Sequence, residues 1–272
     1  MKFVMEKAWE ETLALLKGNL GLLATVAGLL VFLPSVAIAL LFPQDAAPAP
    51  AEDATIEQVI EAVTAQLGEI GWIVLVTTLL SGFASLAMMA LLRRKASPTV
   101  GQAMSEAATL LPTYLGTVAI QLLVIFGLAF LLVGLPYQQG SPGLAVLGML
   151  LLLPIWFYIF VKFSVSVAAI VIDGERNPVE AIKRSWSLTK GNSFRIFFFF
   201  VLIGIAAAII LAIVSWVVST VLSLMPLAVS NVGMALFEGL LNLAGAIFGV
   251  ALTVAIHAQL RRLRDAATAT LD

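Results

Sequence analysis

The sequence has no cysteine, one histidine and few charged side chains. Without cysteine, the 272-residue chain can form no disulfide, thiol nucleophile or cysteine metal site. With a single histidine, most metal and nucleophilic schemes lack parts, so we predict no metal and no cofactor. Phosphate-binding loops, nucleophile elbows, H-E-x-x-H pairs and dinucleotide fingerprints are also absent from the sequence, so we do not expect an enzyme.

What the sequence has is apolar residues, at 61% of the chain, with 11% charged and a mean hydropathy of +1.06. A soluble domain is nearer half apolar and a quarter charged, so this is a membrane protein. A hydrocarbon layer of about 30 Å needs about 20 apolar residues of helix. The sequence therefore predicts an all-α polytopic fold with six spans, near residues 20–42, 70–92, 113–135, 144–172, 194–222 and 236–260.

Basic residues indicate the topology. All 15 fall in four places that six spans put on one side: Lys2 to Lys17, Arg93 to Lys95, Lys162 to Arg195, and Arg261 to Arg264. The three opposite loops, near 43–69, 136–143 and 223–235, contain none. Because basic loops face the cytoplasm, we expect the protein to lie in a bacterial inner membrane with both termini on the cytoplasmic side. A net charge of −1 does not favour nucleic acid as a partner.

The first outer loop, 43–69, is acidic. Its segment QDAAPAPAED reads as an extended linker, and the apolar residues that follow, from Ile56 to Leu67, recur at helical spacing. We expect a short amphipathic helix there, lying on the outer membrane surface as a packing element.

Residues 177–192, NPVEAIKRSWSLTKGN, carry clear helix signals. Asn177 suits the N-cap, Glu180 suits the first turn and can pair with Arg184, and Gly191 suits a left-handed C-terminal cap. We expect a surface helix with an apolar face of Val179, Ile182, Trp186 and Thr189. The residues expected at the lipid headgroups are Lys183, Arg184, Trp186 and Lys190.

Similar segments precede the first and third spans. The N-terminal one ends in Lys17-Gly18-Asn19, as the segment above ends in Lys190-Gly191-Asn192, and a weaker one runs from Ser97-Pro98 to Pro112. We therefore predict a single membrane domain, residues 1–272, made of three repeats of a cytoplasmic amphipathic helix and a two-span hairpin. The repeats cover 1–95, 96–175 and 176–264.

Residues 162–197, KFSVSVAAIVIDGERNPVEAIKRSWSLTKGNSFRIF, resemble the membrane domain of the glycerophosphoryl diester phosphodiesterase membrane-domain family and related six-span bacterial inner-membrane proteins. The matching residues are Lys162, where arginine is more usual, Asp173-Gly174, Ala181, Arg184-Ser185-Trp186, Leu188-Thr189 and Gly191. In those phosphodiesterases, catalysis belongs to a separate soluble barrel domain. The resemblance therefore implies a stand-alone membrane module here.

Polar residues within spans are the first place to look for function, since each costs free energy. If the fourth helix continues to Asp173, Lys162 lies about 16 Å from its end, near mid-membrane, where a lysine costs about 2.5–3.5 kcal/mol. Gln121 lies at a similar depth in the third span. We expect the two to pair, with Ser164 and Ser166 nearby. Lys162 then either binds an anion such as a lipid phosphate or snorkels to the interface.

The sixth span carries a stripe of small and polar residues on one face: Glu238, Asn242, Gly245, Gly249 and Thr253. Gly245-x-x-x-Gly249 favours close helix packing, and a substrate or proton path along the stripe is the alternative. His257, near the inner end, is expected to be a packed or interfacial residue.

These observations favour a non-enzymatic inner-membrane protein that binds or organises lipids or scaffolds membrane proteins. Membrane lipids are the expected partners, and other membrane proteins are further candidates. The alternative is a transporter or flippase for an anionic lipid or small amphiphile.

Overall fold

The computed structural model describes residues 2–42, 56–93 and 98–268, and it contains helices and no strand within those ranges. Six helical runs are long and apolar enough to cross a membrane, which confirms the predicted all-α, six-span fold. They are Met5–Leu41, Ile70–Leu91, Val100–Gln138, Pro142–Asp173, Ser193–Ser223 and Leu227–Ala266.

Several runs combine α-helix with a π-helical turn (η). The elements are α1 (Met5–Ala27), η1 (Gly28–Phe32), α2 (Leu33–Leu41), α3 (Ile56–Leu91), α4 (Val100–Ala129), η2 (Phe130–Gly134), α5 (Leu135–Gln138), α6 (Pro142–Phe163), α7 (Ser166–Ala168), η3 (Ala169–Asp173), α8 (Pro178–Thr189), α9 (Ser193–Ser223) and α10 (Leu227–Thr268). Two π turns precede a proline, Pro34 or Pro136, by two residues. Since proline lacks an N–H and its ring crowds the preceding turn, a wider turn accommodates it without breaking the span.

The first two surface segments differ from the sequence-based expectation. Helix α1 runs through Gly18 without a break, and α4 runs through Pro112 into its span. The N-cap of α4 is Thr99, in a reciprocal capping box with Gln102, rather than Ser97. Gly18 keeps helical geometry, because it is not among the glycines with positive φ. Only α8 forms a separate helix, and the division into three repeats stays a prediction.

The outer amphipathic helix is also continuous with a span. Residues 56–67 are helical, as predicted, but they form the first turns of α3 rather than an isolated element. The linker part of the acidic loop, residues 43–55, lies outside the described residues.

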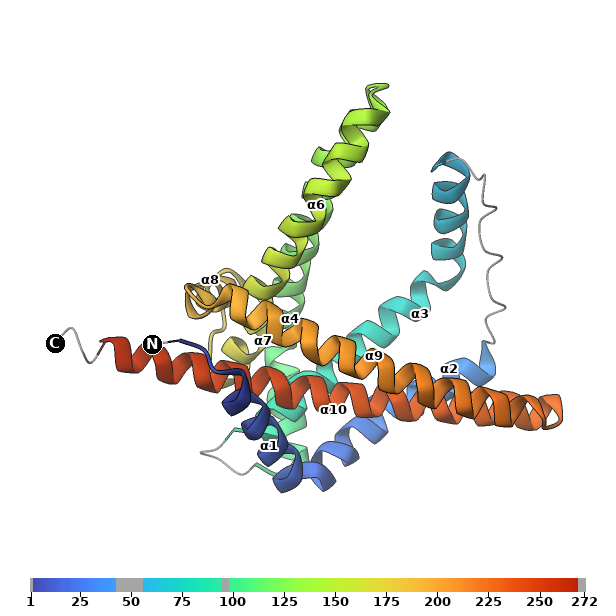
Figure 1. The fold of residues 1–272 in the computed structure, drawn as a ribbon. Coiled ribbons are helices and arrows are strands. Elements are labelled where there is room, and N and C mark those ends of the chain that lie inside the picture. The colour runs from blue at the N-terminus through green and yellow to red at the C-terminus, as the bar shows by residue number, and fades with distance from the viewer. Residues whose placement is uncertain (1, 43–55, 94–97, 269–272) are drawn as a thin grey trace.

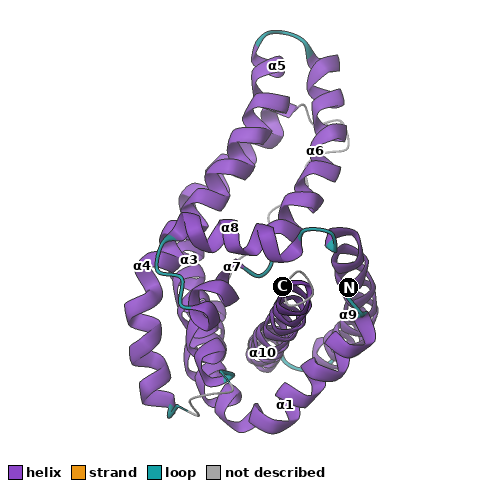
Figure 2. Ribbon diagram, turned by 90° about the vertical axis from the view of Figure 1, so that its left-hand side faces the viewer, coloured by secondary structure: helices purple, strands orange, loops and turns teal. Residues whose placement is uncertain are grey.

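The helices meet at one end of the molecule and diverge from it. In Figure 1 the α5–α6 hairpin points upward and the α9–α10 hairpin points to the right, while α7 and α8 lie where the helices converge. Figure 2 shows α10 nearly end-on, with α1 and α9 around it and α8 crossing above. We call this convergence the basic junction. It comprises residues 2–11, 93, 98–106, 173–195 and 257–264.

Side-chain burial concentrates near the junction. The C-terminal part of α3 packs on the start of α4 through small residues, including Ala84, Ala87, Ala103 and Ala107, all fully buried. Small side chains let two helix backbones approach closely, which is the main source of packing energy inside a bilayer. By contrast, the outer parts of α6 and α9 present large apolar side chains such as Met149, Ile210 and Trp216 to the surroundings.

Candidate functional site

Helix α8 is fixed at both ends as its sequence predicts. The Asn177 side chain accepts hydrogen bonds from the backbone N–H groups of Val179 (2.9 Å) and Glu180 (3.4 Å). Gly191 adopts φ +80°, a conformation that costs glycine little. The face that packs against the spans consists of Ala181, Ser185, Leu188 and Thr189, which are buried, whereas Val179 of the predicted apolar face is exposed.

An ionic cluster around Asp173 joins three segments of the junction. Its carboxylate is 6% exposed and contacts Arg184 Nε (2.9 Å), His257 Nε2 (3.1 Å) and Arg261 Nη1 (3.2 Å). Gly174 follows with φ +79°, which ends the π turn and directs the chain toward α8. The cluster therefore locks the end of the fourth span to α8 and α10.

This cluster corrects the predicted role of Arg184. Its guanidinium folds onto Asp173 rather than pairing with Glu180 or extending to the headgroups. Glu180 instead pairs with Lys183, at 2.8 Å on the exposed face. Lys183 and Lys190 remain exposed, in agreement with a headgroup position. The physical reason is that a buried carboxylate attracts a nearby guanidinium more strongly than an exposed one does.

Lys162 lies beside α8 rather than in an unbroken helix. The fourth span continues to Asp173 as assumed, but α6 ends at Phe163 and the span is interrupted at 164–165 before α7 and η3 continue it. The Lys162 carbonyl accepts a hydrogen bond from Ser185 Oγ (2.6 Å). Its ammonium lies 5.4 Å from the Tyr158 ring centroid and 5.3 Å from that of Trp186, and the residue is 2% exposed. No acidic side chain of the described residues pairs with it.

Gln121 does not pair with Lys162 as predicted. Its Nε2 donates to Ser166 Oγ at 2.9 Å, and Ser166 Oγ donates in turn to the Phe163 carbonyl. Ser164 Oγ donates to the Val161 carbonyl. These serines satisfy backbone carbonyls where α6 breaks, so of the four predicted ligand residues only Lys162 carries a charge to offer a ligand.

Other basic residues tie the junction together. Arg93 contacts Glu106 and the Val171 carbonyl, and Arg262 pairs with Glu11. Arg195 donates to the Phe3 carbonyl (3.0 Å). The four basic segments of the sequence thus meet at the same end of the fold, as six spans require.

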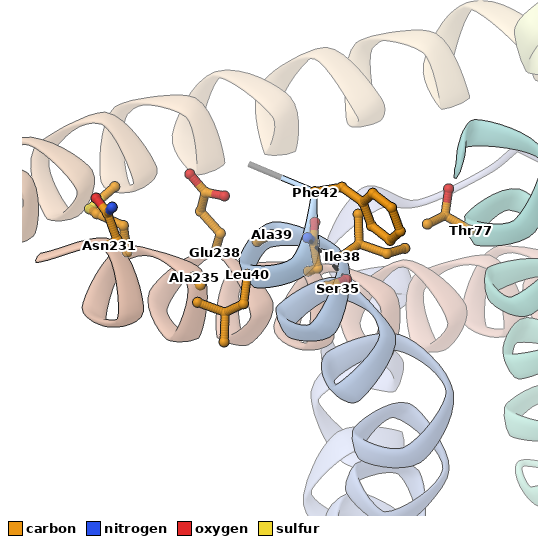
Figure 3. Close-up of a pocket in the computed structure, with 11 residues that line it drawn as sticks. Ser35, Ile38, Ala39, Leu40, Phe42, Thr77, Asn231, Ala235 and Glu238 are labelled. Atoms are coloured by element: carbon orange, nitrogen blue, oxygen red, sulfur yellow. Dashed lines mark hydrogen bonds between the residues drawn. The ribbon is translucent and has the colours of Figure 1, made fainter. Parts of the chain in front are cut away.

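At the other end, the stripe on α10 borders an open cavity of about 680 Å³ between α2, α3 and α10. Figure 3 shows Glu238 and Asn231 of α10 around this cavity. Ser35 of α2, Phe42 just after α2 and Thr77 of α3 lie around it as well. Asn242 Nδ2 donates to Ser35 Oγ (3.5 Å), and Glu238 has no ionic partner within the described ranges.

The expected packing role of Gly245 and Gly249 is wrong. Both are exposed, and a Cβ added at either would meet no atom within 4 Å. The close approach occurs at Gly239, where an added Cβ would lie 2.6 Å from Val36 Cγ2. The orientation of α10 about its own axis explains this. It turns Ile247, Val250 and Val254 toward the core, which leaves the stripe on the open side.

The fold and the composition together define a multi-pass α-helical membrane protein. Residues 139–261 match the family described as the membrane domain of glycerophosphoryl diester phosphodiesterase, which confirms the resemblance seen in the sequence. This range covers α6 to most of α10 and includes the whole Asp173 cluster. No curated protein matches the chain, and no solved structure matches it.

Sequence reasoning missed the cluster's partners. Asp173 and Arg184 appeared only as residues of the family resemblance, and His257 only as a packed residue. His257 and Arg261 lie 84 and 88 residues from Asp173, so no local pattern connects them.

Proposed function

We propose that this protein is a non-enzymatic lipid-binding protein of the bacterial inner membrane, and that it holds an anionic phospholipid at Lys162. The observation that carries the proposal is that Lys162 is 2% exposed and its ammonium lies near two aromatic rings, while no acidic side chain of the described residues pairs with it. A cation–π contact contributes about 0.5–2 kcal/mol, so two rings offset part of the cost of burial without supplying negative charge. A lipid phosphate supplies it.

A groove beside Lys162 suits the acyl chain of such a lipid. It has a volume of about 500 Å³ between α6 and α9, and its walls are almost wholly apolar. Tyr158 belongs both to this groove and to the pair of rings over Lys162. Lys162 does not itself line the groove, so Tyr158 is the link through which the groove and the ammonium would form one amphipathic site.

The test is Lys162→Met, with Lys183→Met as the matched control. Lys183 is exposed on α8, the helix that also carries Trp186. Loss of one charged contact, about 1.5–3 kcal/mol, predicts about 10- to 100-fold weaker retention of anionic phospholipid. Lipid extracted from the purified proteins is quantified by mass spectrometry. Equal retention by Lys162→Met and the control contradicts the proposal.

The proposed orientation places the basic junction, with both termini, in the cytoplasm. Because the chain has no cysteine, single introduced cysteines report sidedness without background. A membrane-impermeant maleimide added to spheroplasts should label Gln139→Cys, at the tip of the α5–α6 hairpin, and spare Ser187→Cys. The reverse pattern inverts the orientation.

Lipid transport is the second candidate, favoured by the open stripe on α10. Its polar and small residues lead from the outer cavity toward the junction, and a Cβ added at Gly245 or Gly249 would meet no atom of the described residues within 4 Å. In proteoliposomes, filling the stripe with Gly245→Leu and Gly249→Leu should abolish transbilayer movement of a fluorescent phospholipid. Ala244→Leu, on an adjacent exposed face, is the control. Equal transport by the unchanged protein, by the variant with both Gly245→Leu and Gly249→Leu, and by Ala244→Leu argues against this candidate.

A further inference from the structure

The basic junction encloses a second cavity, separate from the Lys162 groove. It has a volume of about 480 Å³ between α1, the end of α3, η3 and α10. Its polar walls comprise three arginines, one histidine and two acids: Arg93, Arg261, Arg262, His257, Glu11 and Asp265. We call it the junction cavity.

The three guanidiniums keep hydrogen-bonding capacity after their protein contacts are made. Arg261 uses Nη1 on Asp173, and Arg262 uses Nη2 on Glu11 and Nε on the Ala258 carbonyl. Each guanidinium has five N–H donors in a planar fork, a geometry that suits a phosphate group. Arginines from two separate segments, at the ends of α3 and α10, thus converge on one space.

Two buried nitrogens of the cavity's wall residues have no hydrogen-bond partner: Arg93 Nε and His257 Nδ1. An arginine Nε–H is a donor only. His257 Nε2 contacts the Asp173 carboxylate, which favours the proton on Nε2 and leaves Nδ1 as an acceptor. Both residues line the cavity, and these two atoms are a donor and an acceptor that the described residues leave unused.

We infer that the junction cavity binds a phosphomonoester group, either free inorganic phosphate or a phosphate on a larger molecule. Phosphate oxygens accept from Arg93, Arg261 and Arg262. The phosphate's own O–H donates to His257 Nδ1. A sulfate at neutral pH and a phosphodiester carry no such proton, so the histidine selects against both. The cavity is larger than phosphate alone needs, and the remainder accommodates an attached group.

The test uses the full chain in nanodiscs of zwitterionic phosphatidylcholine, with inorganic phosphate and sulfate titrated by calorimetry. We expect phosphate to bind about tenfold more tightly than sulfate. This factor of about tenfold is the affinity that one hydrogen bond involving a charged group contributes. Arg261→Gln should weaken phosphate binding by about tenfold, and the control Lys183→Gln should not change it. Equal affinities for the two anions, or equal weakening by the control, overturn the inference. If Arg261→Gln does not fold, Arg262→Gln replaces it with the same expectation.

The source of the phosphate is distinguished by lipid composition. If a lipid supplies it, nanodiscs with phosphatidic acid block the phosphate titration, whereas phosphatidylglycerol does not. If a soluble molecule supplies it, phosphate binds in all three compositions. Equal block by both anionic lipids contradicts selection by His257. Under this inference Lys162→Met leaves phosphate binding intact. The phosphate titration therefore tests the junction cavity independently of the lipid site proposed at Lys162.

Discussion

Asp173 and Glu238 are carboxylates near opposite ends of the bundle, and their surroundings differ sharply. Asp173 is nearly covered and has two arginines and a histidine around it. Glu238 is exposed beside an open cavity and has no ionic partner in the described parts of the chain. The first carboxylate holds helices together, whereas the second lies open beside the cavity.

This difference extends to the helices around each carboxylate. At the junction, α8 lies across the spans and small residues bring α3 and α4 together. At the opposite end the hairpins diverge, and between the two ends α10 exposes Gly245 and Gly249. The comparison teaches that polar residues stabilise the fold at one end and remain accessible at the other.

The largest effect is expected from Asp173→Asn. The substitution removes the charge that pairs with Arg184 and Arg261 and the carboxylate that His257 Nε2 contacts. Breaking a buried ion pair costs about 3–5 kcal/mol, and the lower end applies because Arg261 is half exposed. We expect about 3 kcal/mol of lost stability, measured by unfolding in mixed micelles. A loss within the error of that measurement would show that the junction does not depend on this cluster.

A pair of glycine variants compares packing at the two faces of α10. Ala at position 239 or 245 gains the same helix propensity, about 1 kcal/mol. Only Gly239→Ala meets Val36 and Phe32, so it should be less stable than Gly245→Ala by about 1–3 kcal/mol. Identical unfolding midpoints for the two variants would remove the distinction between the packed and the open face.

Asn177→Ala removes the N-cap of α8. A lost cap costs about 1 kcal/mol. Because α8 carries Arg184 to Asp173, we expect faster backbone hydrogen exchange over residues 178–190 and little change in α9. Uniform exchange changes across all helices would indicate that α8 does not open separately.

The smallest effect is expected from Glu238→Gln. An exposed side chain without an ionic partner contributes within about 0.5 kcal/mol, so the unfolding midpoint should be unchanged. Any transport through the outer cavity should fall, measured in the same proteoliposome assay. Destabilisation as large as that of Asp173→Asn would contradict the comparison itself.

The capped helix α8 shows how far the sequence reaches. Asn177, Glu180 and Gly191 specify its ends through contacts within a few residues, so its position was predictable. The rotation of α8 was not, because Ser185 and Thr189 face the core only when the helices that α8 contacts, α4, α6 and α10, are in place. Gly18 and Pro112 show the reverse error: each is a stop signal that the surrounding helix overrides.

The sequence by itself determined the six spans, the gathering of basic residues on one side and the ends of α8. These depend on the transfer of side chains between lipid and water and on hydrogen bonds between near neighbours. Only the tertiary structure decided which cations meet Asp173, which face of α10 stays open and what surrounds Lys162. Those contacts join residues far apart in the chain, and their energies exist only after the helices have packed.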